Sequence, residues 1–69
     1  MSFNKKSKFK GVTYAKNTDS WDAVLQVGVE EITITNFKGI NGEKEAAKAY
    51  DRLCLQYLGT SPNGFFKKL

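Results

Sequence analysis

The chain of 69 residues contains no histidine, and Cys54 is its only cysteine. Protein zinc sites are usually built from several cysteine and histidine ligands, so this composition argues against a structural metal centre. An internal disulfide is also excluded, because it needs two cysteines. We therefore expect an intracellular protein in a reducing compartment, folding without a metal or a cofactor.

The sequence also lacks a long apolar segment and the residues of an acid–base site. No apolar run approaches the roughly 18 residues that suggest a membrane span, and residues 1–6 lack the apolar centre of a signal peptide. Without histidine or clustered carboxylates, no general base or activated nucleophile can be named. We expect neither an enzyme nor a protein that binds a small-molecule substrate or a membrane.

Positive charge is unevenly distributed along the chain, whose formal net charge is +4. Residues 1–16 contain five lysines and no acidic residue, whereas residues 17–37 contain four acidic residues and no basic one. A basic segment beside an acidic one indicates contact with a polyanion through the basic segment. The alternative is an ordinary solvated, lysine-rich terminus.

Alternating apolar and polar residues predict short strands at residues 9–15, 21–27 and 31–35. Residues 17–20 and Gly28 have the composition of tight turns, so the strands are expected to form an antiparallel meander. The inward face of this sheet is predicted to contain Phe9, Val12, Tyr14, Trp21, Ala23, Leu25, Ile32, Ile34 and Phe37. The outward face is predicted to contain Thr13, Ala15, Asp22, Val24, Gln26, Glu31, Thr33 and Thr35.

A helix is predicted to begin near Asn41 or Gly42 and to end before Gly59, a residue that suits a helix C-terminus. Glu43 and Glu45 in its first turn suit the helix dipole. The apolar stripe of this helix consists of Ala46, Tyr50, Leu53, Cys54 and Tyr57, with Ala47 and Ala49 flanking it. The small alanines predict that the helix backbone approaches the sheet closely.

These elements predict an α+β fold in which a three-stranded antiparallel sheet packs on one C-terminal α-helix. We expect one domain, because a chain of 69 residues buries only a modest core. The domain is placed at residues 7–66, between a basic N-terminal arm at residues 1–6 and a tail at residues 67–69. Phe65 and Phe66 are expected to fold back over the edge of the core.

Three motifs resemble the AP2/ERF family of DNA-binding domains. Residues 7–12 (SKFKGV) are similar to its opening S-K-Y-R-G-V, residues 20–23 (SWDA) to its K-W-x-A, and residues 45–51 (EAAKAYD) to its E-A-A-x-A-Y-D. Gly59 and residues 63–65 (NGF) lie near the family's glycine and N-F positions. The long first turn resembles that of the divergent AP2 domains of protists.

The resemblance implies a sequence-specific DNA-binding domain of a transcription regulator in the nucleus. Such a domain reads double-stranded DNA in the major groove with the outward sheet face, and other proteins can bind the rest of the full-length chain. The implied base contacts are Lys10, Thr13, Val24, Gln26 and Thr33. The expected phosphate contacts are the basic residues and the helix tyrosine: Lys5, Lys6, Lys8, Lys16 and Tyr50.

The outward face departs from the family pattern in a way that bears on the DNA target. It carries no arginine, whereas Gln26 can pair with adenine and the methyl groups of Val24 and Thr33 suit the thymine methyl. The sequence therefore predicts an A/T-biased site. Two other functions stay open: a protein-interaction module that has lost specific DNA binding, and a DNA-targeting domain of a mobile-element nuclease.

Three single residues have both a structural and a functional interpretation. Trp21 shares a face with Ala23 and Leu25, so we expect it in the core rather than stacked on a base. Cys54 lies on the apolar helix stripe and is expected to be a small packed side chain rather than a redox group. Asp51 is expected to anchor a turn or a backbone segment.

Overall fold

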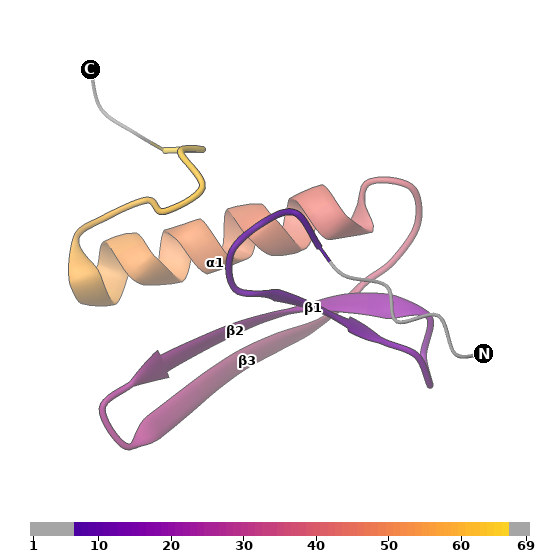
Figure 1. Cartoon of the computed structure of the whole chain (residues 1–69), viewed down its shortest axis with the longest axis horizontal. Coiled ribbons are helices and arrows are strands. Elements are labelled where there is room, and N and C mark those ends of the chain that lie inside the picture. The colour runs from indigo at the N-terminus through magenta and orange to yellow at the C-terminus, as the bar shows by residue number, and fades with distance from the viewer. Residues whose placement is uncertain (1–6, 67–69) are drawn as a thin grey trace.

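The computed structural model describes residues 7–66, which form one sheet and one helix (Figure 1). Strands β1 (Val12–Ala15), β2 (Ser20–Val27) and β3 (Glu30–Phe37) are followed by helix α1 (Gly42–Leu58). The strands form an antiparallel sheet in the order β1-β2-β3, and α1 lies across one face of it. The α+β fold expected from the sequence is therefore confirmed.

Strand β1 is shorter than the predicted strand at residues 9–15, because the chain turns sharply just before it. Gly11 has a φ of 75°, in the left-handed region, which interrupts an extended conformation. The backbone N–H of Lys10 donates to the side chain of Asn63 instead of to a strand partner. The carbonyl of Gly11 still accepts from the N–H of Val24 at 2.8 Å, so the edge of the sheet begins directly after the turn.

A β-bulge in β3 explains how Phe37 reaches the side of the sheet that faces the helix. Ala23 pairs with Ile34, but Trp21 pairs with Phe37, so β3 has one extra residue between these pairs. Asn36, within the bulge, has a φ of 75°. The extra residue shifts the alternation of side chains by one position. Ile34 and Phe37 therefore lie on the same face although they are three residues apart.

The core is a thin layer between α1 and the sheet, and small residues dominate it. Ala46 and Ala47 are 0% exposed, and they form a cluster with the buried Val12. Phe9, Trp21, Phe37 and Phe65 are partly buried and pack against this cluster. The predicted close approach of helix and sheet is confirmed, and so is the packing of Trp21 in the core.

The burial of two helix residues differs from the prediction. Ala47 was placed beside the stripe but is fully buried, because the cluster that includes it is also covered by Phe9 and Phe65 from the two ends of the domain. Tyr57 was placed on the stripe but is 50% exposed. In Figure 1 the tip of the β2–β3 hairpin lies away from the C-terminal end of α1, so the sheet does not cover this last turn.

The buried carboxylate of Asp51 joins the helix to the segment that follows it. It accepts hydrogen bonds from Ser61 Oγ at 2.6 Å, from the backbone N–H of Asn63 at 3.1 Å and from that of Phe65 at 3.1 Å. The Asn63 side chain in turn accepts from the Lys10 N–H at 2.8 Å and donates to the Lys10 carbonyl at 3.1 Å. The expectation that Asp51 anchors a backbone segment is confirmed.

The ends of α1 are fixed by different contacts. Gly59 adopts a left-handed conformation with a φ of 75°, and its N–H donates to the carbonyl of Leu55 at 3.2 Å, as expected for a helix C-terminus. At the N-terminus the Asn41 side chain makes no capping hydrogen bond. The Glu43 carboxylate there accepts from Ser7 Oγ at 2.7 Å and from the Lys8 N–H at 3.1 Å, which ties the start of the domain to the helix.

Candidate nucleic-acid interface

The face of the sheet opposite α1 is the candidate interface, and we call it the outer face. Ala23 and Leu25 of β2 are buried on the side of the helix. The residues that alternate with them in this strand therefore point away from the helix. Figure 1 shows that the described chain places no helix on that side. The outer face is formed by Thr13, Asp22, Val24, Gln26, Glu31 and Thr33.

Strand register brings four of the predicted base contacts onto this one surface. Val24 and Thr33 are direct cross-strand partners in the middle of the outer face. Gln26 lies further toward the β2–β3 turn, and Thr13 lies on the neighbouring strand β1. Thr13, Gln26 and Thr33 are exposed, and Val24 is partly buried. The surface therefore offers two methyl-bearing side chains at its centre and one amide beside them.

Two carboxylates also lie on the outer face. Asp22 is the cross-strand partner of Thr13, and Glu31 is that of Gln26. Asp22 Oδ1 is shielded from solvent and has no hydrogen-bond partner among the described residues. The three strands contain no lysine or arginine. Within the part of the chain that the structure describes, the positive charges nearest this face lie beyond the ends of the strands.

Three lysines flank the outer face at the strand ends. Lys10 lies in the turn before β1, not in a strand as predicted, and its side chain is exposed. Lys16 lies in the turn after β1. Lys38 directly follows β3, and because Ala15 pairs with Ser20 and Trp21 pairs with Phe37, Lys16 and Lys38 leave the same end of the sheet.

Lys38 was not predicted as a contact because it lies between the strand predicted at residues 31–35 and the helix predicted to begin near Asn41. The predicted meander could have indicated its position, because in three consecutive antiparallel strands the first and the third end on the same side of the sheet. The lysine that follows each of these two strands therefore lies at the same end of the sheet. The fold thus places one lysine at the start of β1 and two at the opposite end of the sheet.

The other predicted phosphate contacts lie elsewhere. Lys8 is exposed, with Nζ 5.4 Å from the centroid of the Phe9 ring, and its backbone is held by Glu43 at the helix N-terminus. Lys5 and Lys6 lie outside the described residues. Tyr50 belongs to α1 rather than to the outer face.

The side chain of Tyr50 has a structural role against the edge of β1. A Cβ atom on Gly11 would lie 2.0 Å from Tyr50 Cδ1, so only glycine leaves room for this ring. Burial raises the pKa of the Tyr50 phenol, and a hydrogen bond with Cys54 raises it further. Cys54 itself is fully buried, which confirms the expectation of a packed side chain.

The first turn is organised by Tyr14 and Asp19. The Tyr14 hydroxyl donates to the Asp19 carboxylate, and this hydrogen bond raises the pKa of the phenol. The Tyr14 ring also meets the Trp21 ring edge to face, with 5.1 Å between centroids. The turn that carries Lys16 is thereby held next to the core.

Two further properties of the described chain bear on function. Among residues 7–66, no group of three or more histidine, cysteine, aspartate or glutamate side chains is placed to hold a metal ion. Over the same residues, no helix combines the length and the apolar character needed to cross a membrane.

Comparisons with known proteins were made on this chain in three ways. A scan of protein-family models, a search of curated proteins and a search of solved structures gave no significant match. The fold itself defines the class as a small α+β domain, in which no described helix covers the outer face of the sheet.

Proposed function

We propose that this domain binds double-stranded DNA by laying the outer face of its sheet in the major groove. The observation that carries the proposal is the sheet face that no described helix covers, on which Thr13, Val24, Gln26 and Thr33 lie together. Lys10 precedes β1, and Lys16 and Lys38 lie at the end of the sheet opposite the β2–β3 turn. Three strands separated by about 4.8 Å have a backbone width of roughly 10 Å. The major groove is about 12 Å wide and admits an element of this size.

The side chains of the outer face favour A·T pairs. Gln26 can form two hydrogen bonds with adenine, and the methyl groups of Val24 and Thr33 can contact the thymine methyl. Guanine is read most often by arginine or lysine, and here only lysines at the strand ends, such as Lys10 and Lys16, can reach it. We infer an A/T-biased site with G·C pairs confined to its edges.

The wider context of this proposal is a nuclear transcription regulator of the AP2/ERF type. Support for it comes from the motifs at residues 7–12, 20–23 and 45–51, which resemble that family. Gly11 of the first motif contacts Tyr50 of the third, and Lys10 of the first is linked through Asn63 to Asp51 of the third, so these two motifs hold β1 against α1. The first and third motifs of the resemblance thus contain residues that hold the domain together.

Selection of binding sites from random duplex DNA tests the proposed readout. We expect an enriched motif dominated by A·T pairs. In Gln26→Ala, the free-energy preference for A·T over other base pairs should fall by about 1–3 kcal/mol at one position of the motif. The affinity for non-specific DNA should stay nearly unchanged. A matched control is Gln56→Ala, which removes the same side chain from an exposed position of α1 and should leave the motif intact. A motif of consecutive G·C pairs would contradict this assignment.

One observation favours a second function, a protein-interaction module. Asp22 and Glu31 place two carboxylates on the outer face, where they repel phosphates. Titration with random duplex DNA at low salt separates the two functions. Absence of binding there, or binding without any sequence preference, would favour the interaction module.

A further inference from the structure

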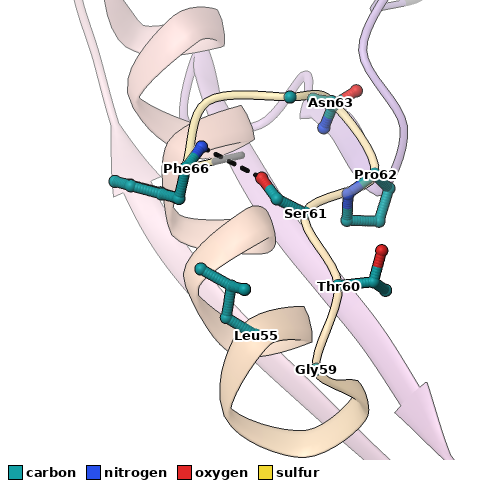
Figure 2. A pocket seen from close by; sticks show the side chains of 8 residues that line it. Leu55, Gly59, Thr60, Ser61, Pro62, Asn63 and Phe66 are labelled. Carbon is teal, nitrogen blue, oxygen red and sulfur yellow. Dashed lines mark hydrogen bonds between the residues drawn. The ribbon is translucent and has the colours of Figure 1, made fainter. Parts of the chain in front are cut away.

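A shallow pocket lies beside the C-terminal half of α1, well away from the outer face (Figure 2). Its apolar lining comes from Leu55 on the helix and from Pro62 and Phe66 in the segment that folds back along it. Leu55 is 39% exposed, whereas the neighbouring Cys54 is buried in the core. The pocket therefore belongs to the exposed side of the helix and takes no part in the packing of the sheet.

The walls of this pocket are held in place by hydrogen bonds within the domain. Ser61 Oγ donates to the buried carboxylate of Asp51 at 2.6 Å and accepts from the Phe66 N–H at 3.1 Å. Figure 2 shows this second bond closing the loop that forms one side of the pocket. A binding site that exists before its ligand arrives loses less conformational entropy on binding.

Positive charge lines the helix next to the pocket. Lys44, Lys48 and Arg52 are spaced four residues apart and thus lie along one side of α1, and Leu55 continues this row three residues later. The Arg52 guanidinium lies 5.7 Å from the centroid of the Phe66 ring, at the rim of the pocket.

The acidic residues of α1 do little to neutralise this row. Glu43 is engaged with Ser7, and Asp51 is buried on another side of the helix. Glu45 lies 4.0 Å from Lys48, which leaves Lys44 and Arg52 without an acidic partner among the described ion pairs. The sequence adds Lys67 and Lys68 directly after Phe66.

We propose that this surface binds an acidic amphipathic segment of a partner protein. One aliphatic or aromatic side chain of the partner would enter the pocket against Leu55, Pro62 and Phe66. Its carboxylates would meet Arg52 at the rim of the pocket and Lys44 further along the same side of α1. Charge complementarity selects this occupant: a phosphate backbone would use the cations but leave the apolar pocket empty, and a purely apolar ligand would leave the cations unused.

The test uses the whole 69-residue chain labelled with ¹⁵N and a short synthetic peptide. The peptide forms a helix with leucine and phenylalanine on one side and aspartate and glutamate on the other. A second peptide has the same composition in scrambled order. We expect saturable shifts of the amide signals of Leu55, Gly59, Ser61 and Phe66 with the first peptide and much smaller shifts with the second.

Three variants make the test specific. Leu55→Ser, at an exposed position, and Arg52→Glu should each weaken binding by roughly fivefold or more, because they remove the apolar contact or reverse a rim charge. Lys16→Glu makes the same charge change at the sheet end and should leave the affinity unchanged. Equal loss with Lys16→Glu would show general charge attraction and overturn the proposal.

Other occupants of the surface give different results. If the pocket signals shift with protein concentration in the absence of peptide, the surface binds a second copy of the chain, and the proposal is wrong. If duplex DNA shifts the same signals and displaces the peptide, the row of cations is a nucleic-acid site instead. Because the outer face is separate, a change of sequence preference in Gln26→Ala has no bearing on this outcome.

Discussion

At the scale of single residues, Asp51 determines the arrangement of both ends of the domain. Its buried carboxylate accepts from Ser61, Asn63 and Phe65, and Asn63 carries the connection on to Lys10. A buried carboxylate is tolerated in a protein interior only when donors of this kind surround it. The position of Lys10 next to the outer face thus depends on an aspartate in the helix.

Replacement of this aspartate should destabilise the domain strongly. In Asp51→Ala, the backbone N–H groups of Asn63 and Phe65 lose their acceptor, and we expect a loss of about 3 kcal/mol in the free energy of unfolding. Urea denaturation measures this loss. The control Glu45→Ala removes an exposed acid of the same helix and should change the stability by less than about 0.5 kcal/mol. Equal effects of the two variants would mean that the anchor contributes little.

The raised pKa of Tyr50 should make the domain less stable at alkaline pH. Burial, followed by the hydrogen bond with Cys54, raises the pKa of the phenol above its ordinary value of 10.0. The folded state therefore favours the neutral phenol, so this contribution is fully present below pH 10.0 and is lost as the pH rises through the folded-state pKa. The urea midpoint should fall less steeply with alkaline pH in Tyr50→Phe. An unchanged slope in that variant would contradict the assignment.

At the scale of elements, the alternation of the strands and the alanines of the helix were sufficient to predict the layers. The order of the elements, the helix-facing residues of β2 and the role of Gly59 all follow from local patterns. Lys10 was misplaced because its backbone partner, Asn63, is far away in sequence. Tyr57 was misplaced because helical periodicity indicates a face but not how far the opposing sheet extends along it.

The close contact of α1 with its neighbours can be tested by enlarging a buried alanine. Ala47→Leu adds a bulky side chain where the native residue is fully buried, and it should destabilise the domain by about 1–3 kcal/mol. For a domain of this size, each kcal/mol lowers the melting temperature by about 4–8 °C. Ala46→Leu should act similarly, whereas Gln56→Leu at an exposed position of the same helix should not. An unchanged melting temperature in Ala47→Leu would mean that this side of the helix is open.

At the scale of the whole molecule, the two faces of the domain differ in charge and in geometry. The outer face is broad, with carboxylates on it and lysines only at the strand ends. The exposed side of α1 carries a row of basic residues beside an apolar pocket. The two proposals therefore place DNA on the sheet and a protein partner on the helix, on separate faces of the domain.

The salt dependence of DNA binding distinguishes the two faces. If Lys10, Lys16 and Lys38 contact phosphates, replacing each with alanine should flatten the plot of log affinity against log salt by about 0.9. The loss should be similar on every DNA sequence, because phosphate contacts carry no sequence information. Lys5 and Lys6 lie outside the described residues. Their replacement with alanine should flatten the same plot if the N-terminal arm follows the DNA phosphate backbone. The measurement is a fluorescence titration of a duplex at several salt concentrations.

The matched control for this experiment is Lys44→Ala, which removes the same charge from the exposed side of α1. The net charge of each single variant is then identical, so any difference in slope reports position and not total charge. We expect the slope to stay unchanged in Lys44→Ala and to fall in Lys16→Ala and Lys38→Ala. The reverse result would place DNA on the helix. In that case the outer face, with Asp22 and Glu31, would be the surface left for a protein partner.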